Sequence, residues 1–195
     1  MSYVFCATTN AGKLREFSLA LAVEVLPGLD RIPAPCETGV TFEENAVLKA
    51  LYYSKHCSGL LFAEDSGLEV DALDGAPGVY SARCAGEGAP DEQNNRLLLA
   101  RMQGVADRSA RFVSVIALAR AGELVKTFTG VVEGLVLEAA RGENGFGYDP
   151  VFYYPPFNCS FGEATLAQKM SVSHRSQAAL AMKAAILSTA SIKLS

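Results

Sequence analysis

Two adjacent carboxylates at the end of an apolar run constrain this sequence more than any other feature. The run 60–62 (Leu-Leu-Phe) is typical of a short buried strand, and Glu64 and Asp65 follow almost at once. Ser66-Gly67 then predicts a turn before a second apolar run over 68–70. Adjacent carboxylates at the exit of a buried strand are unfavourable unless a cation, a hydrogen-bond donor or water meets them. The stretch therefore predicts a mixed α/β fold with either a site for a hard metal ion or a solvated acidic turn at this strand end.

The composition is that of a chain able to fill one sizeable core, so we expect a single domain over 1–195. Half of the 195 residues are hydrophobic and 19% are charged. No apolar run reaches the roughly 20 residues of a membrane span, and no signal peptide is expected at the N-terminus. Lys and Arg number 17 against 21 Asp and Glu, without a basic run, so we expect no nucleic-acid partner. The five scattered cysteines form no CxxC pair, which indicates reduced thiols and a cytoplasmic location.

Hydrophobic periodicity and turn signals predict alternating strands and helices along the chain. Thr41 and Glu44 match a capping box at the start of a helix, so Glu44 has a complete structural explanation before any chemistry is considered. The segment 74–83 is rich in turn residues and predicts no helix. The other expected strands are 3–7, 23–26, 110–119, 124–129, 131–137 and 151–154. The expected helices are one with a stripe of Leu14, Phe17, Ser18 and Leu21 after the 8–13 loop, those over 41–57, 90–102 and 176–190, and a helical turn over 164–170.

The loop between the first strand and the first helix has two explanations that the sequence leaves open. It reads Thr-Thr-Asn-Ala-Gly-Lys over 8–13. Small polar residues before a helix N-terminus suit the binding of an anion. Thr or Asn also caps many helices without any ligand, in which case Lys13 would be solvated. The loop is not a Walker A motif, because Ala7 and Leu14 replace the Gly and the Ser or Thr of that motif.

Missing motifs exclude several classes of enzyme. His56 and His174 are the two histidines and lie far apart in the sequence, which excludes an HExxH zinc site. No serine lies in a G-x-S-x-G elbow, and no G-x-G-x-x-G fingerprint occurs. There remain the acidic pair, the 8–13 loop, an aromatic and acidic loop over 142–150, and His174-Arg175. Together they suit a magnesium-dependent enzyme that acts on a phosphorylated substrate with a flat ring.

In combination these motifs resemble the inosine triphosphate pyrophosphatase family, which hydrolyses deaminated purine nucleoside triphosphates (ITP, dITP, XTP) to the monophosphate and pyrophosphate. The matching stretches occur in the family's order and cover nearly the whole chain. The resemblance implies an elongated, two-lobed single α/β domain around a long mixed twisted sheet flanked by helices. It also implies a Mg²⁺ cofactor and a homodimer. The stretches are Thr8–Lys13, Thr41–Ala46, Glu64–Leu68, Gly75–Arg83, Gly145–Pro150 and Ser173–Arg175.

The resemblance further implies a role for each motif. Glu44 and Asp65 are expected to bind Mg²⁺, and Asp65 is also expected to accept the proton of the attacking water. Ser66 would contact the substrate, and Phe146 would stack on its base. The expected triphosphate loop consists of Thr8, Thr9, Asn10, Ala11, Gly12 and Lys13. The expected base pocket consists of Phe146, Gly147, Tyr148, Asp149, Lys169, His174 and Arg175, of which the last three would read the 6-oxo group.

Three positions depart from the family pattern. Thr9 stands where Gly is frequent, Glu64 where Asp is frequent, and Cys84 where an aromatic residue is common. The first two leave individual roles open, including whether Glu64 joins the metal site. Two other functions also stay open: a related house-cleaning pyrophosphatase that prefers pyrimidine or modified nucleotides, and a nucleotide-binding module without turnover.

Overall fold

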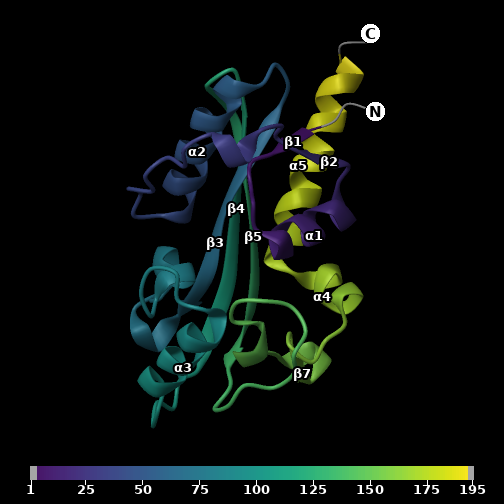
Figure 1. Cartoon of the computed structure of the whole chain (residues 1–195). Helices are drawn as coiled ribbons and strands as arrows, with labels where there is room; N and C mark the ends of the chain where they lie inside the picture. Colours follow the sequence, from purple (N-terminus) through teal and green to yellow (C-terminus); the bar gives the residue numbers. More distant parts are fainter. Residues whose placement is uncertain (1–3, 193–195) are drawn as a thin grey trace. The chain divides into compact units, whose positions relative to one another are not determined.

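Strand β3 (Leu61–Val70) continues through Ser66 and Gly67 without a turn. The structure, a computed structural model, describes residues 4–192 (Figure 1). The turn predicted at Ser66-Gly67 is therefore wrong. Gly67 meets a different requirement, because a Cβ at this position would collide with the side chain of Ser81. The glycine allows two backbones to approach each other closely.

Within residues 4–192 the strands form one seven-stranded mixed sheet in the order β2-β1-β3-β4-β5-β6-β7. Strand β1 pairs in parallel with β2 and β3, whereas β6 pairs antiparallel with β5 and β7. The expected α/β class and mixed sheet are confirmed. The remaining strands are β1 (Val4–Cys6), β2 (Val23–Val25), β4 (Ser109–Arg120), β5 (Glu123–Val136), β6 (Phe152–Tyr154) and β7 (Cys159–Ser160).

The helices begin close to where the sequence places them, with two differences. Helix α5 begins at His174, so His174 and Arg175 belong to the last helix rather than preceding it. The segment expected to lack helix contains a 3₁₀ helix over Gly78–Arg83. No helix in the described part of the chain combines the length and apolar character needed to cross a bilayer. The α-helices are α1 (Ala11–Ala20), α2 (Phe42–Tyr53), α3 (Asp91–Arg101), α4 (Leu166–Val172) and α5 (His174–Ile192).

The hairpin between β4 and β5 turns at Ala121 and Gly122, which have φ values of 52° and 85°. Positive φ at two central residues matches the right-handed twist of the flanking strands. The two strands expected over 124–129 and 131–137 are in fact one strand, β5. Gly130 lies inside this strand. Glycine is needed there because any Cβ would collide with the backbone of α5 at His174.

The chain divides into two compact units, which are described separately. Unit 1 comprises the described parts of 1–65, 114–130 and 174–195, and unit 2 comprises 66–113 and 131–173. In unit 1, α1 and α5 lie side by side (Figure 1), and Phe17 packs edge-on against Phe62 of β3 at a ring-centroid distance of 4.9 Å. In unit 2, Phe112, Phe152 and Phe161 form an aromatic core. These large rings are buried together with aliphatic side chains, and their burial contributes to the hydrophobic stabilisation of each unit.

Candidate active site

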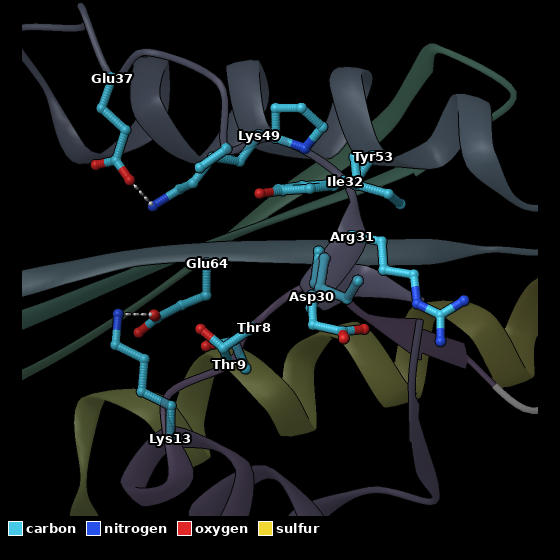
Figure 2. Close-up of a pocket in the computed structure, with 14 residues that line it drawn as sticks. Thr8, Thr9, Lys13, Asp30, Arg31, Ile32, Glu37, Lys49, Tyr53 and Glu64 are labelled. Atoms are coloured by element: carbon cyan, nitrogen blue, oxygen red, sulfur yellow. Dashed lines mark hydrogen bonds and ion pairs between the residues drawn. The ribbon is translucent and has the colours of Figure 1, made fainter. Parts of the chain in front are cut away.

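A polar cavity of about 590 Å³ opens in unit 1 where the short strand β1 ends beside the longer β3 (Figure 2). The loop after β1 and the first turn of α1 form one side of it, and α2 forms the other. Figure 2 shows Glu64 and Lys13 on one side of β3 and Glu37 and Lys49 on the opposite side. The residues lining the cavity are Ala7, Thr8, Thr9, Lys13, Leu29–Ala34, Glu37, Lys49, Tyr53 and Glu64.

The two adjacent carboxylates point to opposite faces of β3. Successive side chains alternate across a strand, and β3 continues through both residues. Glu64 therefore meets α1, where the ammonium of Lys13 lies 2.7 Å from its Oε2. Asp65 meets α2, where the ammonium of Lys49 lies 2.7 Å from its Oδ1. The expectation of a solvated acidic turn is wrong, because both carboxylates are buried and have cationic partners.

Glu64 lies in a buried network of donors. Its side chain is 1% exposed, and its Oε1 accepts hydrogen bonds from Ser114 at 2.9 Å and from Arg175 Nε at 3.1 Å. Arg175, itself 2% exposed, also donates to Glu16, which is equally buried. Burial alone would lower the pKa of Arg175, but the carboxylates of Glu64 and Glu16 outweigh burial and raise it. The opposite charges of this network compensate one another, and Glu64 and Lys13 are its members that line the cavity.

Asp65 lies in a more open environment on the α2 side. Lys49 approaches Asp65 and also lies 3.2 Å from Glu37, and Asn45 makes a long hydrogen bond of 3.5 Å to Asp65. Burial raises the pKa of Asp65 above its ordinary value, although Lys49 acts in the opposite direction. Burial lowers the pKa of Lys49, and the charges of Asp65 and Glu37 more than reverse this effect. Asp65 is thus a buried carboxylate with increased basicity, and its partner Lys49 lines the polar cavity.

The 8–13 loop folds as a helix cap, and its residues Thr8, Thr9 and Lys13 also line the cavity. Asn10 is the N-cap of α1 and accepts a hydrogen bond from the Lys13 amide at 3.0 Å. Thr8 Oγ1 accepts another from the Asn10 amide at 3.2 Å. The predicted capping by Asn is confirmed, and Lys13 is bound to Glu64 rather than solvated. The predicted role in triphosphate binding stays a prediction.

Glu44 closes the capping box expected of it. Its Oε2 accepts hydrogen bonds from the amides of Val40 at 2.7 Å and Thr41 at 3.3 Å. The cavity is lined instead by Glu37 from the preceding loop. The role of Glu44 as a metal ligand stays a prediction, and Glu37 is a carboxylate that the sequence reasoning missed.

Other residues of the site were also missed by the sequence reasoning. Lys49 follows Asn45 by four residues, so both lie on one face of α2, and this spacing was a signal that could have identified them. Glu16, three residues after Lys13 in α1, had the same type of signal. Glu37 carried none, because it lies in an irregular loop that follows Pro33 and Pro35.

In unit 2, part of the expected base pocket is brought together. Lys169 and Asp149 form an ion pair of 2.5 Å whose side chains are 3% and 2% exposed. Asp149 Oδ2 also accepts a hydrogen bond from the Phe146 amide at 2.9 Å, and the ammonium of Lys169 lies 4.9 Å from the centre of the Phe146 ring. Tyr148 donates its hydroxyl to the carbonyl of Ser81 at 2.9 Å, and burial raises its pKa far above the ordinary value. An aromatic ring, a carboxylate and an ammonium therefore occupy one cluster.

The other residues expected to bind substrate lie elsewhere in the two units. His174 and Arg175 are buried in unit 1 at the start of α5. Ser66 is half-buried on β3, immediately after Asp65. Gly147 has a φ of +62° and follows Phe146 in the loop of unit 2. Their contacts with substrate stay predictions.

Comparisons with known proteins identify one family. A family model described as "Ham1 family" matches residues 4–185. A protein from Exiguobacterium sp. named dITP/XTP pyrophosphatase is 46% identical over 186 residues, covering 93% of this chain and 95% of that relative. A protein of the same name from Acidobacterium capsulatum is 48% identical over 189 residues, covering 90% of this chain and 93% of that relative.

Solved structures show the same similarity. The Staphylococcus aureus Ham1 protein matches with a TM-score of 0.87 at 39% identity, covering 96% of this chain and 100% of that chain. The nucleoside-triphosphatase / dITP/XTP pyrophosphatase from Mycobacterium abscessus matches with a TM-score of 0.74 at 39% identity, covering 92% of this chain and 98% of that chain. At this identity and coverage the similarity extends over sequence and fold alike.

Proposed function

The chain belongs to the Ham1 family, and we propose that it hydrolyses deaminated purine nucleoside triphosphates to the monophosphate and pyrophosphate. The relatives named above are called dITP/XTP pyrophosphatases, which supports dITP and XTP as substrates, and the family resemblance adds ITP. The observation that carries the proposal is Asp65, a buried carboxylate bound to Lys49, which lines the same cavity as Thr8, Thr9 and Lys13.

The cavity has the groups needed to bind phosphates. Helix α1 begins at Ala11, and a helix N-terminus presents backbone N–H groups and the positive end of the helix dipole to an anion. Lys13, Arg31 and Lys49 line the same cavity and add positive charge. Thr8 and Thr9 add hydroxyl donors. These groups suit a triphosphate chain, whose negative charge increases on the leaving pyrophosphate.

Asp65 is the proposed proton acceptor for the attacking water. A general base works best when its pKa approaches the working pH, and burial raises the pKa of Asp65 in that direction. Lys49 and Asn45 hold the carboxylate in a defined orientation. A nucleotide-binding module without turnover has no need of such a base.

The proposal includes Mg²⁺. Across the described residues no group of three or more His, Cys, Asp or Glu side chains is arranged to hold a metal ion. Mg²⁺ is usually bound by one or two carboxylates together with waters and substrate phosphates, so a complete protein cage is not required. Asp65 and Glu37 approach the same ammonium, so this donor set suits a cation, and these two residues would hold it. When bound, Mg²⁺ would neutralise phosphate charge and lower the pKa of a bound water.

Base recognition is assigned to the cluster in unit 2. Phe146 offers a ring for stacking, and Lys169 offers a donor that is buried with Asp149. A donor favours the 6-oxo acceptor of hypoxanthine or xanthine over the 6-amino donor of adenine. Sites with dedicated polar partners discriminate by roughly 10⁴-fold. His174 and Arg175 remain predicted contributors to this selectivity.

We also propose a cytoplasmic homodimer. All five cysteines are free thiols, which supports a reducing compartment. The dimer follows from the family resemblance. Light scattering coupled to size-exclusion chromatography measures it directly, and a monomeric mass at micromolar concentration would contradict it.

One substrate panel tests the proposed activity. Pyrophosphate and orthophosphate release are measured in parallel for ITP, dITP, XTP, GTP, ATP, UTP and dTTP, with Mg²⁺ and with EDTA. We expect pyrophosphate as the first product, ITP, dITP and XTP far ahead of ATP, and no turnover with EDTA. Preference for UTP or dTTP would instead support a house-cleaning pyrophosphatase of the pyrimidine type, and tight binding without turnover would support a binding module.

A further inference from the structure

We propose that Asp91 and Asn95 of helix α3 are positioning residues that clamp Gly147 and so hold the loop carrying Phe146 and Asp149. The inference rests on the proposed function, because it assigns these residues to the base-recognition cluster of that site. Neither residue belongs to any motif of the family resemblance.

The clamp is formed by hydrogen bonds to both peptide groups of Gly147. The Gly147 amide donates to Asp91 Oδ2 at 2.6 Å, and Asn95 Nδ2 donates to the Gly147 carbonyl at 3.1 Å. Asp91 and Asn95 are four residues apart, so they project from the same face of α3 on consecutive turns. The loop therefore meets a rigid element at two points, and this fixes both its position and its direction.

Gly147 is the position in the loop where such a clamp has the most effect. Its φ of +62° lies in the left-handed region, and no atom lies within 4 Å of where a Cβ would be. The open surroundings mean that packing does not determine this conformation. Glycine also has more backbone freedom to lose than any other residue. The hydrogen bonds from α3 are the contacts that select one backbone conformation here.

The chemistry of Asn95 agrees with this role. Asn95 is 7% exposed, and its Nδ2 must face the Gly147 carbonyl, because an amide oxygen there would oppose another acceptor. Its Oδ1 is buried and has no hydrogen-bond partner among the described residues, and Asn95 lines a cavity of about 410 Å³ beside the loop. A buried amide whose oxygen has no hydrogen-bond partner adds little to stability, because the cost of burying the oxygen offsets the bond made by the nitrogen. Its bond to Gly147 is therefore better explained by positioning of the loop.

The clamp continues directly into the recognition cluster. Phe146 precedes Gly147, and its amide donates to Asp149 Oδ2, the atom that also binds Lys169. A shift of the Gly147 peptide would therefore move the Phe146 ring and change the geometry of Asp149. Misplacement of a binding group by about 1 Å is enough to reduce catalysis by about 100-fold.

Four variants test the proposal. Asp91→Ala and Asn95→Ala each remove one hydrogen bond of the clamp, and Asp91→Asn keeps an acceptor for the Gly147 amide. Glu92→Ala is the matched control, because Glu92 is also an acid in the first turn of α3 and its contact is an exposed ion pair with Arg96. Removal of Asp91 or Glu92 weakens the helix N-terminus similarly, so a difference between them reports on Gly147.

The first measurement is amide hydrogen exchange over 145–149, which does not depend on which nucleotide is the substrate. We expect Asp91→Ala and Asn95→Ala to increase exchange there by about tenfold, Asp91→Asn to increase it less, and Glu92→Ala to match the wild type. Equal exchange in Asp91→Ala and Glu92→Ala would overturn the clamp.

The second measurement separates positioning of the base loop from general damage. We expect Asp91→Ala and Asn95→Ala to raise KM for ITP about tenfold with a smaller change in kcat, and Asp91→Asn to restore most of the loss. The inhibition constant of inorganic tripolyphosphate, which lacks a base, should change less than twofold. An unchanged KM for ITP, or an equal loss for tripolyphosphate, would overturn the positioning role. Failure of the wild type to hydrolyse ITP would instead contradict the proposed function and leave the exchange result to decide on the clamp.

Discussion

The ammonium of Lys49 lies 2.7 Å from Oδ1 of Asp65, so the carboxylate that we propose as general base is bound to a cation from the neighbouring helix α2. Lys49 also reaches Glu37 at 3.2 Å. This arrangement places two carboxylates around one positive charge at the edge of the cavity. The positive charge of Lys49 offsets part of the cost of burying Asp65, whose pKa is raised by burial.

Asp65→Asn is expected to lower kcat by about 10²–10⁴-fold, because the amide keeps the shape of the side chain but cannot accept a proton. The melting temperature should change little, since Lys49 keeps Glu37 as a partner. Steady-state pyrophosphate release and thermal unfolding measure the two effects. Glu69→Gln is the control: it removes a half-buried carboxylate of β3 that pairs with Arg111. Near-normal turnover by Asp65→Asn would mean that another residue activates the water.

Glu37→Gln and Glu44→Gln distinguish the two candidate partners of Asp65 in metal binding. Gln serves almost as well as Glu in a capping box, so Glu44→Gln should alter stability by only about 0.3–1 kcal/mol. If Glu37 holds Mg²⁺, Glu37→Gln raises the Mg²⁺ concentration for half-maximal activity and Glu44→Gln does not. The sequence-based hypothesis for Glu44 expects the reverse. A Mg²⁺ titration of pyrophosphate release for each variant decides between them, and no shift in either would contradict both assignments.

Arg175→Ala is expected to lower the free energy of unfolding by about 3–5 kcal/mol, because it leaves Glu16 and Glu64 buried without its guanidinium. The hypothesis that Arg175 reads the 6-oxo group adds that the ITP/ATP ratio of kcat/KM shrinks. Glu16→Ala is the matched variant, since it breaks the same ion pair and keeps Arg175. Equal changes in the ratio for the two variants, measured well below their melting temperatures, would show that Arg175 acts through the fold and not on the base.

Cys6 is expected to resist alkylation in the folded protein. Burial, reinforced by the charge of Glu64, raises the pKa of its thiol from 9.0 to about 12, whereas Cys36 is exposed. Because the folded pKa lies above the unfolded one, this thiol contributes stability that is complete below pH 9.0 and is lost as the pH rises through about 12. Labelling with iodoacetamide at mildly alkaline pH, mapped by mass spectrometry, should modify Cys36 well before Cys6. Full denaturation in urea should equalise the two, and rapid native labelling of Cys6 would contradict its burial.

Local patterns in the sequence were sufficient for most of the secondary structure. The capping of α1 by Asn10 and the capping box of Thr41 and Glu44 were predicted because a cap depends on residues within one helical turn. The α/β class followed from the alternation of apolar runs and helical stripes. These features need no knowledge of distant contacts.

Two of the errors share one physical cause. Gly67 and Gly130 were interpreted as breaks in strands, but each lies inside a continuous strand where another segment leaves no room for a Cβ. A glycine needed for close approach and a glycine needed for a turn look the same in a sequence. Only the packing partner, Ser81 in one case and the backbone of His174 in the other, distinguishes them.

The sequence by itself therefore determined most of the elements, the caps of α1 and α2 and the presence of an acidic centre at Glu64 and Asp65. The tertiary structure decided which charged partners these two carboxylates have. Because β3 continues through it, alternation directs Glu64 toward Arg175, 111 residues away in the chain, and Asp65 toward Lys49. Ion pairs of this kind form between residues whose separation along the chain carries no information about their distance in space, so only the folded chain could place these charges together.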